Sequence, residues 1–346
     1  MPTPAQPNSG PPGAAAAWDS PGVGPAGQGL LLVLGLLGLG AGAVASVLRV
    51  FPPNDGFPVM IASFIAYGVV ATAVGLILLT VAWYRSHRPI AVGALTALTV
   101  ALLVLQISWQ LPLYVPDGRA ARTKPFTLLS INMRASESDP AELMTQARQS
   151  DVLVLLESTP NALRLLQRAG LDEQFGYHAG GATETRNGSA IYSRFPLSEI
   201  QPLPPTSFPM WSATTLVPDV GPVRVVAAHQ CNPFCGPGKW PGEHAVLREF
   251  VEGQQAHPLV VAGDFNAVND HGPMQRLRAA GLRSATEITG AGWLPTYPAG
   301  SVLPPLIPID HVLLNEQLTA LSITTVEVAG TDHLGLLTTL AGTGTP

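Results

Sequence analysis

Polar side chains recur at the ends of apolar runs in the second part of the chain. In sequence order they are Asn132, Glu157, His229, Asp264, Asn266, Asp310, Asp332 and His333. Short apolar runs are typical of buried strands. Polar residues that repeatedly end such strands are expected to meet at one rim of a sheet. The four carboxylates at that rim repel one another unless a positive charge lies among them. We therefore predict a polar site that binds a cation.

Oxygen ligands without cysteine suit a hard divalent cation, so Mg²⁺ or Mn²⁺ fits this site better than zinc. Beside such a metal the expected chemistry is phosphoryl transfer to water, because the cation neutralises the phosphate oxygens and the leaving group. Asp264 or His333 would align the attacking water as a base. Asn132 and Asn266 would donate hydrogen bonds to phosphate oxygens without adding negative charge.

Apolar runs, amphipathic segments and Gly/Pro turns alternate from about residue 125 onward. Strands are expected over 126–133, 151–158, 188–193, 223–229, 258–265, 309–315 and 321–328, and helices over 140–149, 160–169, 241–253 and 272–281. Several of the strands are apolar on both sides of the pleat, which is typical of strands covered on both faces. The pattern predicts an α/β fold in which helices cover layered sheets.

The first part of the chain has a different composition. Residues 1–117 carry three basic and three acidic residues, whereas the remainder carries 15 basic and 20 acidic residues. Uncharged stretches cover 29–48, 57–84 and 90–114, and each reaches the roughly 20 residues that cross a ~30 Å hydrocarbon layer as a helix. We expect a disordered Pro/Gly/Ala-rich tail over 1–28, a membrane domain with three transmembrane helices over 29–116, and a catalytic domain over 117–346.

Small and polar residues in these stretches bear on how the spans pack. Gly38 and Gly42 form a GxxxG pair in the first stretch, and we expect it to serve packing within the chain before dimerisation. Gln106 and Gln110 lie one turn apart in the third stretch. They are expected to cap the span at the membrane interface, and the alternative is a polar step that faces the lipid.

Composition limits the function classes. A formal net charge of −5 provides no overall cationic field for a nucleic-acid backbone, so any nucleic-acid contact must be local. The chain has two cysteines, Cys231 and Cys235, which excludes a disulfide-rich scaffold and a four-cysteine zinc site. A short-loop disulfide in an oxidising compartment and two free thiols in a reducing one both stay open.

Seven segments together resemble a known family. SINMR, VLLES, NGSAIYSRFPL, VVAAHQCN, VVAGDFNA, PIDHVLL and GTDHLGL occur in this order over about residues 125–340, and the order resembles that of the endonuclease/exonuclease/phosphatase superfamily. The combination of GDFN, IDHV and a terminal TDH is its most specific part. The resemblance implies a DNase I-like, four-layer α/β sandwich and a metal-dependent hydrolase that acts on phosphoester bonds.

The resemblance also implies binding roles for matching positions. Asn132 resembles the Asn that orients the phosphate at the metal site, and Asn232 matches an Asn of the phosphate site. Glu157 resembles the principal metal-binding carboxylate, and Asp332 resembles a further carboxylate of the metal site. Thr331 stands where this family usually has Ser, which keeps the hydroxyl.

The remaining implied roles are catalytic. His229 occupies a position that contacts the phosphate or assists the leaving group. Asp264 and Asn266 match the GDxN pair that positions the attacking water and the phosphate. Asp310 resembles the Asp that orients the terminal histidine, and His333 resembles that histidine, which acts as a base or stabilises the transition state.

Three functions are compatible with these features. The fold resemblance favours a nuclease, but the acidic charge and scattered basic residues disfavour one. Three spans would hold the site near a bilayer, where phosphorylated lipids are concentrated; the architecture is similar to that of actinobacterial teicoplanin-resistance membrane proteins, which implies a prenyl-pyrophosphate phosphatase. An inactive binding domain is the third candidate, and the complete set of site residues disfavours it.

The three predicted spans imply a multi-pass protein of the cell membrane. Four basic residues flank the spans on the side of the catalytic domain and two on the opposite side, a distribution that leans weakly toward a cytoplasmic catalytic domain. The family resemblance and the paired cysteines favour the opposite side. We expect an extracytoplasmic catalytic domain.

Overall fold

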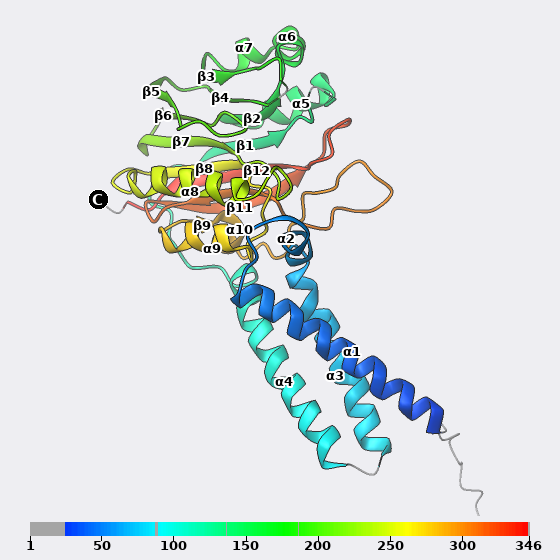
Figure 1. The fold of residues 1–346 in the computed structure, drawn as a ribbon. Helices are drawn as coiled ribbons and strands as arrows, with labels where there is room; N and C mark the ends of the chain where they lie inside the picture. The colour runs from blue at the N-terminus through cyan, green and yellow to red at the C-terminus, as the bar shows by residue number, and fades with distance from the viewer. Residues whose placement is uncertain (1–24, 87–88, 136, 186, 345–346) are drawn as a thin grey trace, which may run out of the picture.

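The computed structural model describes residues 25–86, 89–135, 137–185 and 187–344. Within these ranges, long helices near the N-terminus lead into two stacked six-stranded sheets with helices on their outer faces (Figure 1). Residues 1–24 of the expected tail lie outside the described residues. Residues 25–28, which were also expected in the tail, belong to the first helix.

The two sheets share a plan. In spatial order, the first consists of β11 (Leu318–Val326), β12 (Gly335–Gly342), β1 (Phe126–Asn132), β2 (Val152–Ser158), β4 (Gly188–Ser193) and β3 (Tyr177–Gly181). The second consists of β5 (Leu197–Pro202), β6 (Trp211–Val217), β7 (Gly221–His229), β8 (Leu259–Asp264), β10 (Asp310–Leu314) and β9 (Arg283–Ser284). Each sheet has one parallel pair near its centre, β1 with β2 and β7 with β8, and its other pairs are antiparallel.

Side chains on both faces of these strands are buried. In β2, Val152, Val154 and Leu156 join the core between the sheets, whereas Leu153 and Leu155 join a second core under the outer helices. The outer face of the first sheet is covered by α5 (Pro140–Ala147), α6 (Pro160–Arg168) and α7 (Leu171–Gln174), and that of the second by α8 (Lys239–Glu252) and α9 (Gly272–Ala279) (Figure 1). The predicted α/β sandwich of four layers is confirmed.

The expected strands and helices of this part are present, with ends shifted by a few residues. The elements not expected from the sequence are β3, β5, β6, β9, β12, α7 and α10 (Ala285–Thr289). Several of these elements are short, and β5 is exposed along most of its length, so it lacks the apolar pattern of a buried strand.

The N-terminal helices are α1 (Pro25–Val50), α2 (Gly56–Ala62), α3 (Gly68–Arg85) and α4 (Ile90–Gln110), with 3₁₀ turns η1 (Ile65–Tyr67) and η2 (Leu111–Leu113). By length and composition, three segments could cross a membrane: 26–50, 65–85 and 90–113. The expectation that 57–84 forms one span is corrected, because α2 is a separate helix. Its Val59 is buried in the core that also contains residues of α8 and α9.

Close packing joins α1 to α3. A Cβ atom at Gly38 would lie 2.7 Å from the Cα of Gly75, so the GxxxG pair serves packing within the chain, as predicted. Gln106 is buried rather than interfacial or lipid-facing: its Nε2 donates to the carbonyl oxygen of Gly42 (2.8 Å) and to Oγ of Ser46 (3.0 Å). In apolar surroundings an amide needs such partners, and α1 provides them.

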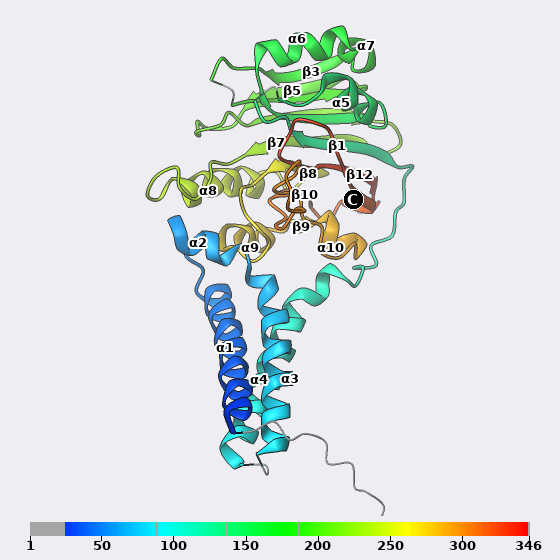
Figure 2. The ribbon, with the colours of Figure 1, turned by 90° about the vertical axis from the view of Figure 1, so that its right-hand side faces the viewer.

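Polar contacts attach these helices to the sandwich. Arg49 at the end of α1 forms an ion pair with Asp270 (2.7 Å), and Gln110 at the end of α4 donates to the same carboxylate (3.3 Å). Nε2 of His271 bonds to the carbonyl oxygen of Val59 at 3.0 Å. Figure 2 shows α2 beside α9, above the long helices and below α8. The N-terminal helices therefore pack directly against the sandwich.

Candidate active site

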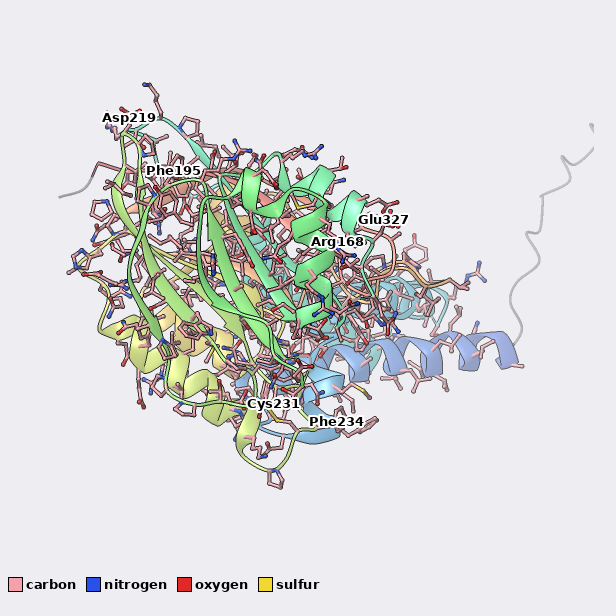
Figure 3. All side chains as sticks on the ribbon, turned by 90° about the horizontal axis from the view of Figure 1, so that it is seen from above. Arg168, Phe195, Asp219, Cys231, Phe234 and Glu327 are labelled. Atoms are coloured by element: carbon pink, nitrogen blue, oxygen red, sulfur yellow. A yellow bond between two sulfur atoms is a disulfide. The ribbon has the colours of Figure 1, made fainter. Side chains whose placement is uncertain are left out.

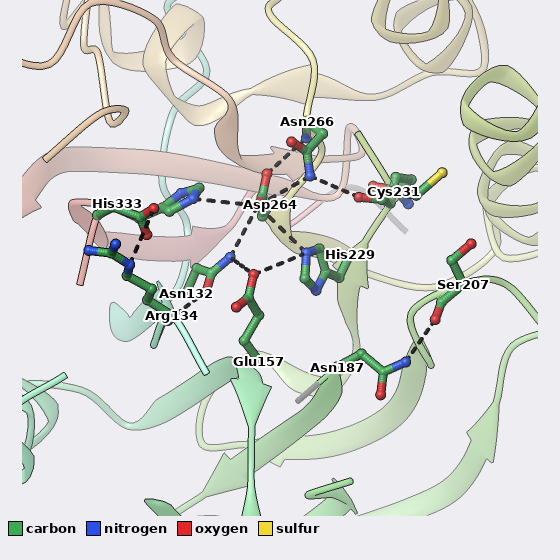
Figure 4. Close-up of polar contacts among 12 residues, drawn as sticks. Asn132, Arg134, Glu157, Asn187, Ser207, His229, Cys231, Asp264, Asn266 and His333 are labelled. Carbon is green, nitrogen blue, oxygen red and sulfur yellow. Dashed lines mark hydrogen bonds and ion pairs between the residues drawn. The ribbon is translucent and has the colours of Figure 1, made fainter. Parts of the chain in front are cut away.

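The predicted site residues gather where β1, β2, β7 and β8 end (Figure 4). Strand register sets the arrangement: His229 of β7 lies opposite Asp264 of β8, and Asp264 lies opposite Asp310 of β10. Nδ2 of Asn132, at the end of β1, donates to Asp264 (3.2 Å) and to Glu157 of β2 (3.0 Å). Residues from both sheets thus meet at the carboxyl ends of the two parallel strand pairs.

The glycine before Asp264 permits this close approach. Gly263 has φ of 151°, a conformation that side chains disfavour, and a Cβ atom there would collide with the carbonyl oxygen of Ala228. Only glycine therefore allows β7 and β8 to approach at this point. The side chains of His229 and Asp264, which follow, are brought into contact.

Backbone strain is concentrated around the same residues. Arg134, Glu157 and Asn266 have φ values of 46°, 56° and 47°, in the left-handed region that non-glycine residues rarely adopt. Conformations of this kind cost free energy and persist where the surrounding structure enforces them, often at functional sites. Here they direct side chains from the strand ends into one cavity.

His333 is held by a carboxylate on either side. Its Nδ1 lies 2.8 Å from Oδ2 of Asp310, and its Nε2 lies 3.8 Å from Oδ2 of Asp264. Burial opposes a charge on this imidazole, but Asp310, Asp264 and Asp332 together raise its pKa to about 10. Without a bound metal, His333 is therefore an imidazolium at neutral pH, suited to stabilising negative charge rather than to accepting a proton.

Asp264 lies at the centre of the polar network and contacts most of its members. Its Oδ1 accepts a hydrogen bond from the backbone N–H of Asn266 (2.8 Å), and its Oδ2 lies 3.6 Å from Nε2 of His229. Burial raises the pKa of the Asp264 carboxyl, although His333 and His229 oppose this. A carboxylate whose pKa lies above its ordinary value is a better proton acceptor, so Asp264 suits the role of general base.

His229 is neutral and fixed by an aromatic ring. Burial lowers its pKa to about 4, against the opposing charge of Asp264. The ring of Phe208 stacks on it with centroids 3.9 Å apart. A neutral imidazole in contact with the Asp264 carboxylate can donate a hydrogen bond to a phosphate or leaving-group oxygen without adding charge.

Glu157 and Asp332 provide the open side of the site. Their side chains are 25% and 30% exposed, against 2% for Asp264. Burial raises the pKa of the Glu157 carboxyl; the hydrogen bond from Asn132 opposes this, and the charge of Asp264 adds to it. A hard divalent cation held by Glu157 and Asp332 would relieve the repulsion, so the donor set fits one.

Another acidic cluster offers a poorer metal site. Ligand atoms of Asp264, Asp310 and His333 lie within 4.8 Å of one another. However, the Asp310–His333 pair uses its facing atoms for each other, and all three side chains are buried. Glu157 and Asp332 therefore fit a metal better than this cluster does. Bound there, a divalent cation would neutralise phosphate oxygens and the leaving group.

The asparagines and Thr331 lie in or around this network. Oδ1 of Asn132 accepts from the backbone N–H of Arg134 (2.9 Å), so as placed this side chain orients Glu157 and Asp264. Its predicted metal contact stays a prediction. Asn266 donates to the carbonyl oxygen of Gln230 (2.9 Å), and Asn232 lines the cavity. The Thr331 hydroxyl bonds to the backbone of Asn132 (2.7 Å) and of His333 (3.2 Å), which gives the retained hydroxyl a structural role.

The catalytic cavity has a volume of about 410 Å³. Several of its lining residues were not predicted from the sequence, among them Met60, Ser63, Arg134, Phe208 and Tyr297. Arg134 stands two positions after Asn132, in the SINMR motif, and could have been found there. The others come from segments that carry no motif, and folding alone brings them to the site.

A loop closed by a disulfide borders the cavity. Cys231 and Cys235 are paired, and Phe234 between them is exposed and lines the cavity. The loop and the residues after it contact the start of α2: the N–H of Gly56 donates to the carbonyl oxygen of Pro233, and the N–H of Gly238 donates to Oδ1 of Asp55, each at 2.9 Å. Figure 3 shows this loop beside α2.

Comparison with known proteins identifies the family. Residues 129–333 match the model of the Endonuclease/Exonuclease/phosphatase family, and the chain belongs to this family. It is a metal-dependent hydrolase of phosphoester bonds, the activity class of that family, which includes nucleases and phosphatases. No curated protein matches the chain by sequence.

Solved structures agree on the fold. A Bacteroides vulgatus endonuclease/exonuclease/phosphatase is 16% identical over 63% of this chain and 99% of its own, with a TM-score of 0.53. Humanized TDP2 of D. rerio is 15% identical over 62% of this chain and 98% of its own (TM-score 0.52). D. rerio TDP2 complexed with a single-strand DNA product is 14% identical over 63% and 99%, with a TM-score of 0.51. At these identities the similarity shows the DNase I-like fold.

Proposed function

We propose that the chain is a membrane-anchored phosphoesterase that hydrolyses the phosphate ester or pyrophosphate of a lipid, such as a prenyl pyrophosphate. One observation carries the proposal: Met60 and Ser63 line the catalytic cavity, and the candidate span 65–85 begins directly after them. The residues that lead into an apolar helix therefore form part of the wall of this cavity. That placement suits a substrate whose phosphate is attached to a membrane-embedded chain.

The side chains around the cavity favour a lipid as the substrate. Apolar side chains of Phe234, Ile307 and Ile309 line it, and Arg134 is the one Lys or Arg among its described lining residues. A groove for single-stranded nucleic acid needs several cations along the backbone and aromatic rings for the bases. Beside the cavity, α2 exposes Phe57 and Ile61, as a helix lying in the membrane interface does.

The proposed reaction uses the network described above. Asp264 and Asn266 position a water molecule, whose oxygen forms a bond to phosphorus while its proton passes to the Asp264 carboxylate. The bond between phosphorus and the leaving oxygen breaks, and His229 assists that oxygen. His333, oriented by Asp310, stabilises the negative charge of the transition state. Glu157 and Asp332, with Asn132 beside them, would hold the cation, which we propose to be Mg²⁺ with Mn²⁺ as the alternative.

Nucleic acid is the second candidate substrate, because one similar structure is a complex with a single-strand DNA product. The experiment compares both. Detergent-purified full-length protein is treated with chelator, reloaded with Mg²⁺ or Mn²⁺, and assayed on undecaprenyl pyrophosphate, a phospholipid set and supercoiled DNA. Asp264→Ala serves as the blank. Phosphate release from the lipid alone supports the proposal, whereas metal-dependent DNA nicking that vanishes in the blank overturns it. A protein that is inactive on all of these substrates would point to the inactive binding domain.

We also propose that the catalytic domain lies outside the cytoplasm of a cell in whose membrane the three helices are embedded. Disulfides persist in oxidising compartments, so the pairing of Cys231 with Cys235 supports this side. Intact cells would be reduced and then labelled with a membrane-impermeant thiol reagent. Labelling of both cysteines before lysis is expected; protection until lysis places the domain inside.

A further inference from the structure

A second cavity lies at the junction of the long helices and the sandwich. Its volume is about 420 Å³, within the ~300–1,000 Å³ of small-molecule sites. We call it the junction cavity; its lining includes Tyr67, Val70, Ile107, Leu111, Tyr114 and Trp293. The first five belong to the ends of α3 and α4 or the turns beside them, and Trp293 belongs to the catalytic part. The cavity is thus built by both parts of the chain.

The junction cavity is linked to the catalytic cavity by a shared wall. Ser63 lines the catalytic cavity, and Tyr67, one turn later, lines the junction cavity. The Tyr67 hydroxyl donates to the carbonyl oxygen of Leu306 (2.8 Å), whose own N–H donates to Tyr297 (2.8 Å). The Tyr297 ring lies 5.1 Å from that of His333. Tyr67, Leu306 and Tyr297 therefore connect the junction cavity to His333 in the catalytic cavity.

We propose that the junction cavity binds the hydrocarbon chain of the lipid whose phosphate occupies the catalytic cavity. This inference rests on the proposed function and adds a recognition site to it. Apolar side chains dominate the lining, and two of its polar groups are already bonded within the protein: Gln110 to Asp270, and Tyr67 to Leu306. The cavity also lies at the ends of the candidate spans 65–85 and 90–113, where a chain enters from the bilayer.

This arrangement makes recognition depend on chain length. Each methylene group that enters the junction cavity leaves the polar region of the site and gains apolar contact. A long-chain substrate gains this binding, whereas a short-chain substrate with the same phosphate does not reach it. Because the chain is remote from phosphorus, filling the cavity should change KM and leave kcat nearly unaltered.

Two tryptophan substitutions on α3 form a matched pair for the test. Val70 lines the junction cavity and Ile77, further along the helix, does not, yet both are 62% exposed. For Val70→Trp we expect the KM for hexadecyl pyrophosphate to rise about tenfold or more, the effect of displacing roughly two methylene groups. Its KM for butyl pyrophosphate and both kcat values should stay near those of the wild type. Ile77→Trp should match the wild type on both substrates.

Other results overturn the inference. Equal changes on both substrates would mean that Val70→Trp disturbs the catalytic cavity, and unchanged kinetics on both would mean that the junction cavity holds no substrate chain. The same effect in Ile77→Trp would assign it to the surrounding bilayer. A change in the oligomeric state of Val70→Trp in detergent would instead assign the cavity to contact with a second copy.

A binding measurement separates this inference from the proposed function. Hexadecyl phosphonate with a photoactivatable group at the chain end is cross-linked to the protein in detergent. Labelling of the segments around Ile107 and Trp293 that is lost in Val70→Trp and kept in Ile77→Trp supports the cavity even when no lipid pyrophosphate is hydrolysed. Labelling spread along all three helices and competed by plain phospholipid overturns it, even when hydrolysis is observed.

Discussion

Two cavities of nearly equal volume lie on either side of the segment 63–67, and charged side chains line only the catalytic one. The catalytic cavity collects Glu157, Asp264 and His333 from strand ends, whereas the junction cavity collects Val70 and Ile107 from helices. The first is suited to charge and proton transfer, and the second to an apolar chain. The difference indicates that reaction and recognition are assigned to separate structural layers, which substitutions should separate.

The largest effect is expected from Asp264→Ala in the catalytic cavity. Removing the proposed general base should lower kcat by about 10²- to 10⁴-fold, for butyl and hexadecyl pyrophosphate alike, and His333→Ala should act in the same direction. Initial rates at saturating metal measure this. Circular dichroism and thermal unfolding control for the fold, and a folded variant with near wild-type kcat would remove the residue from its assigned role.

A large effect on metal dependence is expected from Glu157→Gln. The substitution keeps the shape of the side chain but removes a charge that would hold the cation, so the Mg²⁺ concentration for half-maximal rate should rise at least about tenfold. Titration of chelator-treated protein with Mg²⁺ measures the change. Gln167→Glu, a substitution of the converse kind on α6, provides the control. An unchanged Mg²⁺ requirement in Glu157→Gln would place the metal elsewhere.

A smaller effect concerns the contact that holds α2 between the two cavities. Burial lowers the pKa of His271 to about 4, while its bond to Val59 opposes this. Because the unfolded chain binds the proton at an ordinary pKa of about 6.5, the stabilisation is complete above that pH and is lost as the pH falls toward 4. His244 and His311, also buried with lowered pKa values, act with the same sign.

Thermal unfolding as a function of pH tests this expectation. The Tm of the wild type should fall between about pH 6.5 and pH 4, and it should fall less steeply in His271→Gln, whose amide can still donate to Val59. Parallel curves for the two proteins would show that His271 contributes nothing to the acid sensitivity.

The smallest effect is expected from Tyr67→Phe, which keeps the ring in the junction cavity and removes the hydroxyl bonded to Leu306. A hydrogen bond of this kind contributes about 0.5–1.5 kcal/mol, so the KM for hexadecyl pyrophosphate should rise only a few-fold. The KM for butyl pyrophosphate is the internal control. An equal rise for both substrates would mean that the wall positions the catalytic residues and not the chain.

The catalytic cavity was far more predictable from the sequence than the junction cavity. Strand ends carry their chemistry in short motifs, so Asp264 and His333 could be assigned to one rim before the fold was known. Met60 and Tyr67 belong to an apolar stretch, where hydropathy alone does not distinguish a short helix packed on the catalytic part from a membrane span. Gln106 was misassigned for a related reason, because its partner Gly42 lies on another helix.

The shared carboxylate of Asp270 has a consequence for the catalytic part on its own. Asp270 is buried and lies six positions after Asp264, and the ends of two long helices bind it through Arg49 and Gln110. A protein that lacks residues 1–117 would lose Arg49, Gln110 and the buried Val59 together. It would leave an unpaired acid and an open apolar surface on the loop that follows Asp264, so the N-terminal helices are also a structural part of the catalytic domain.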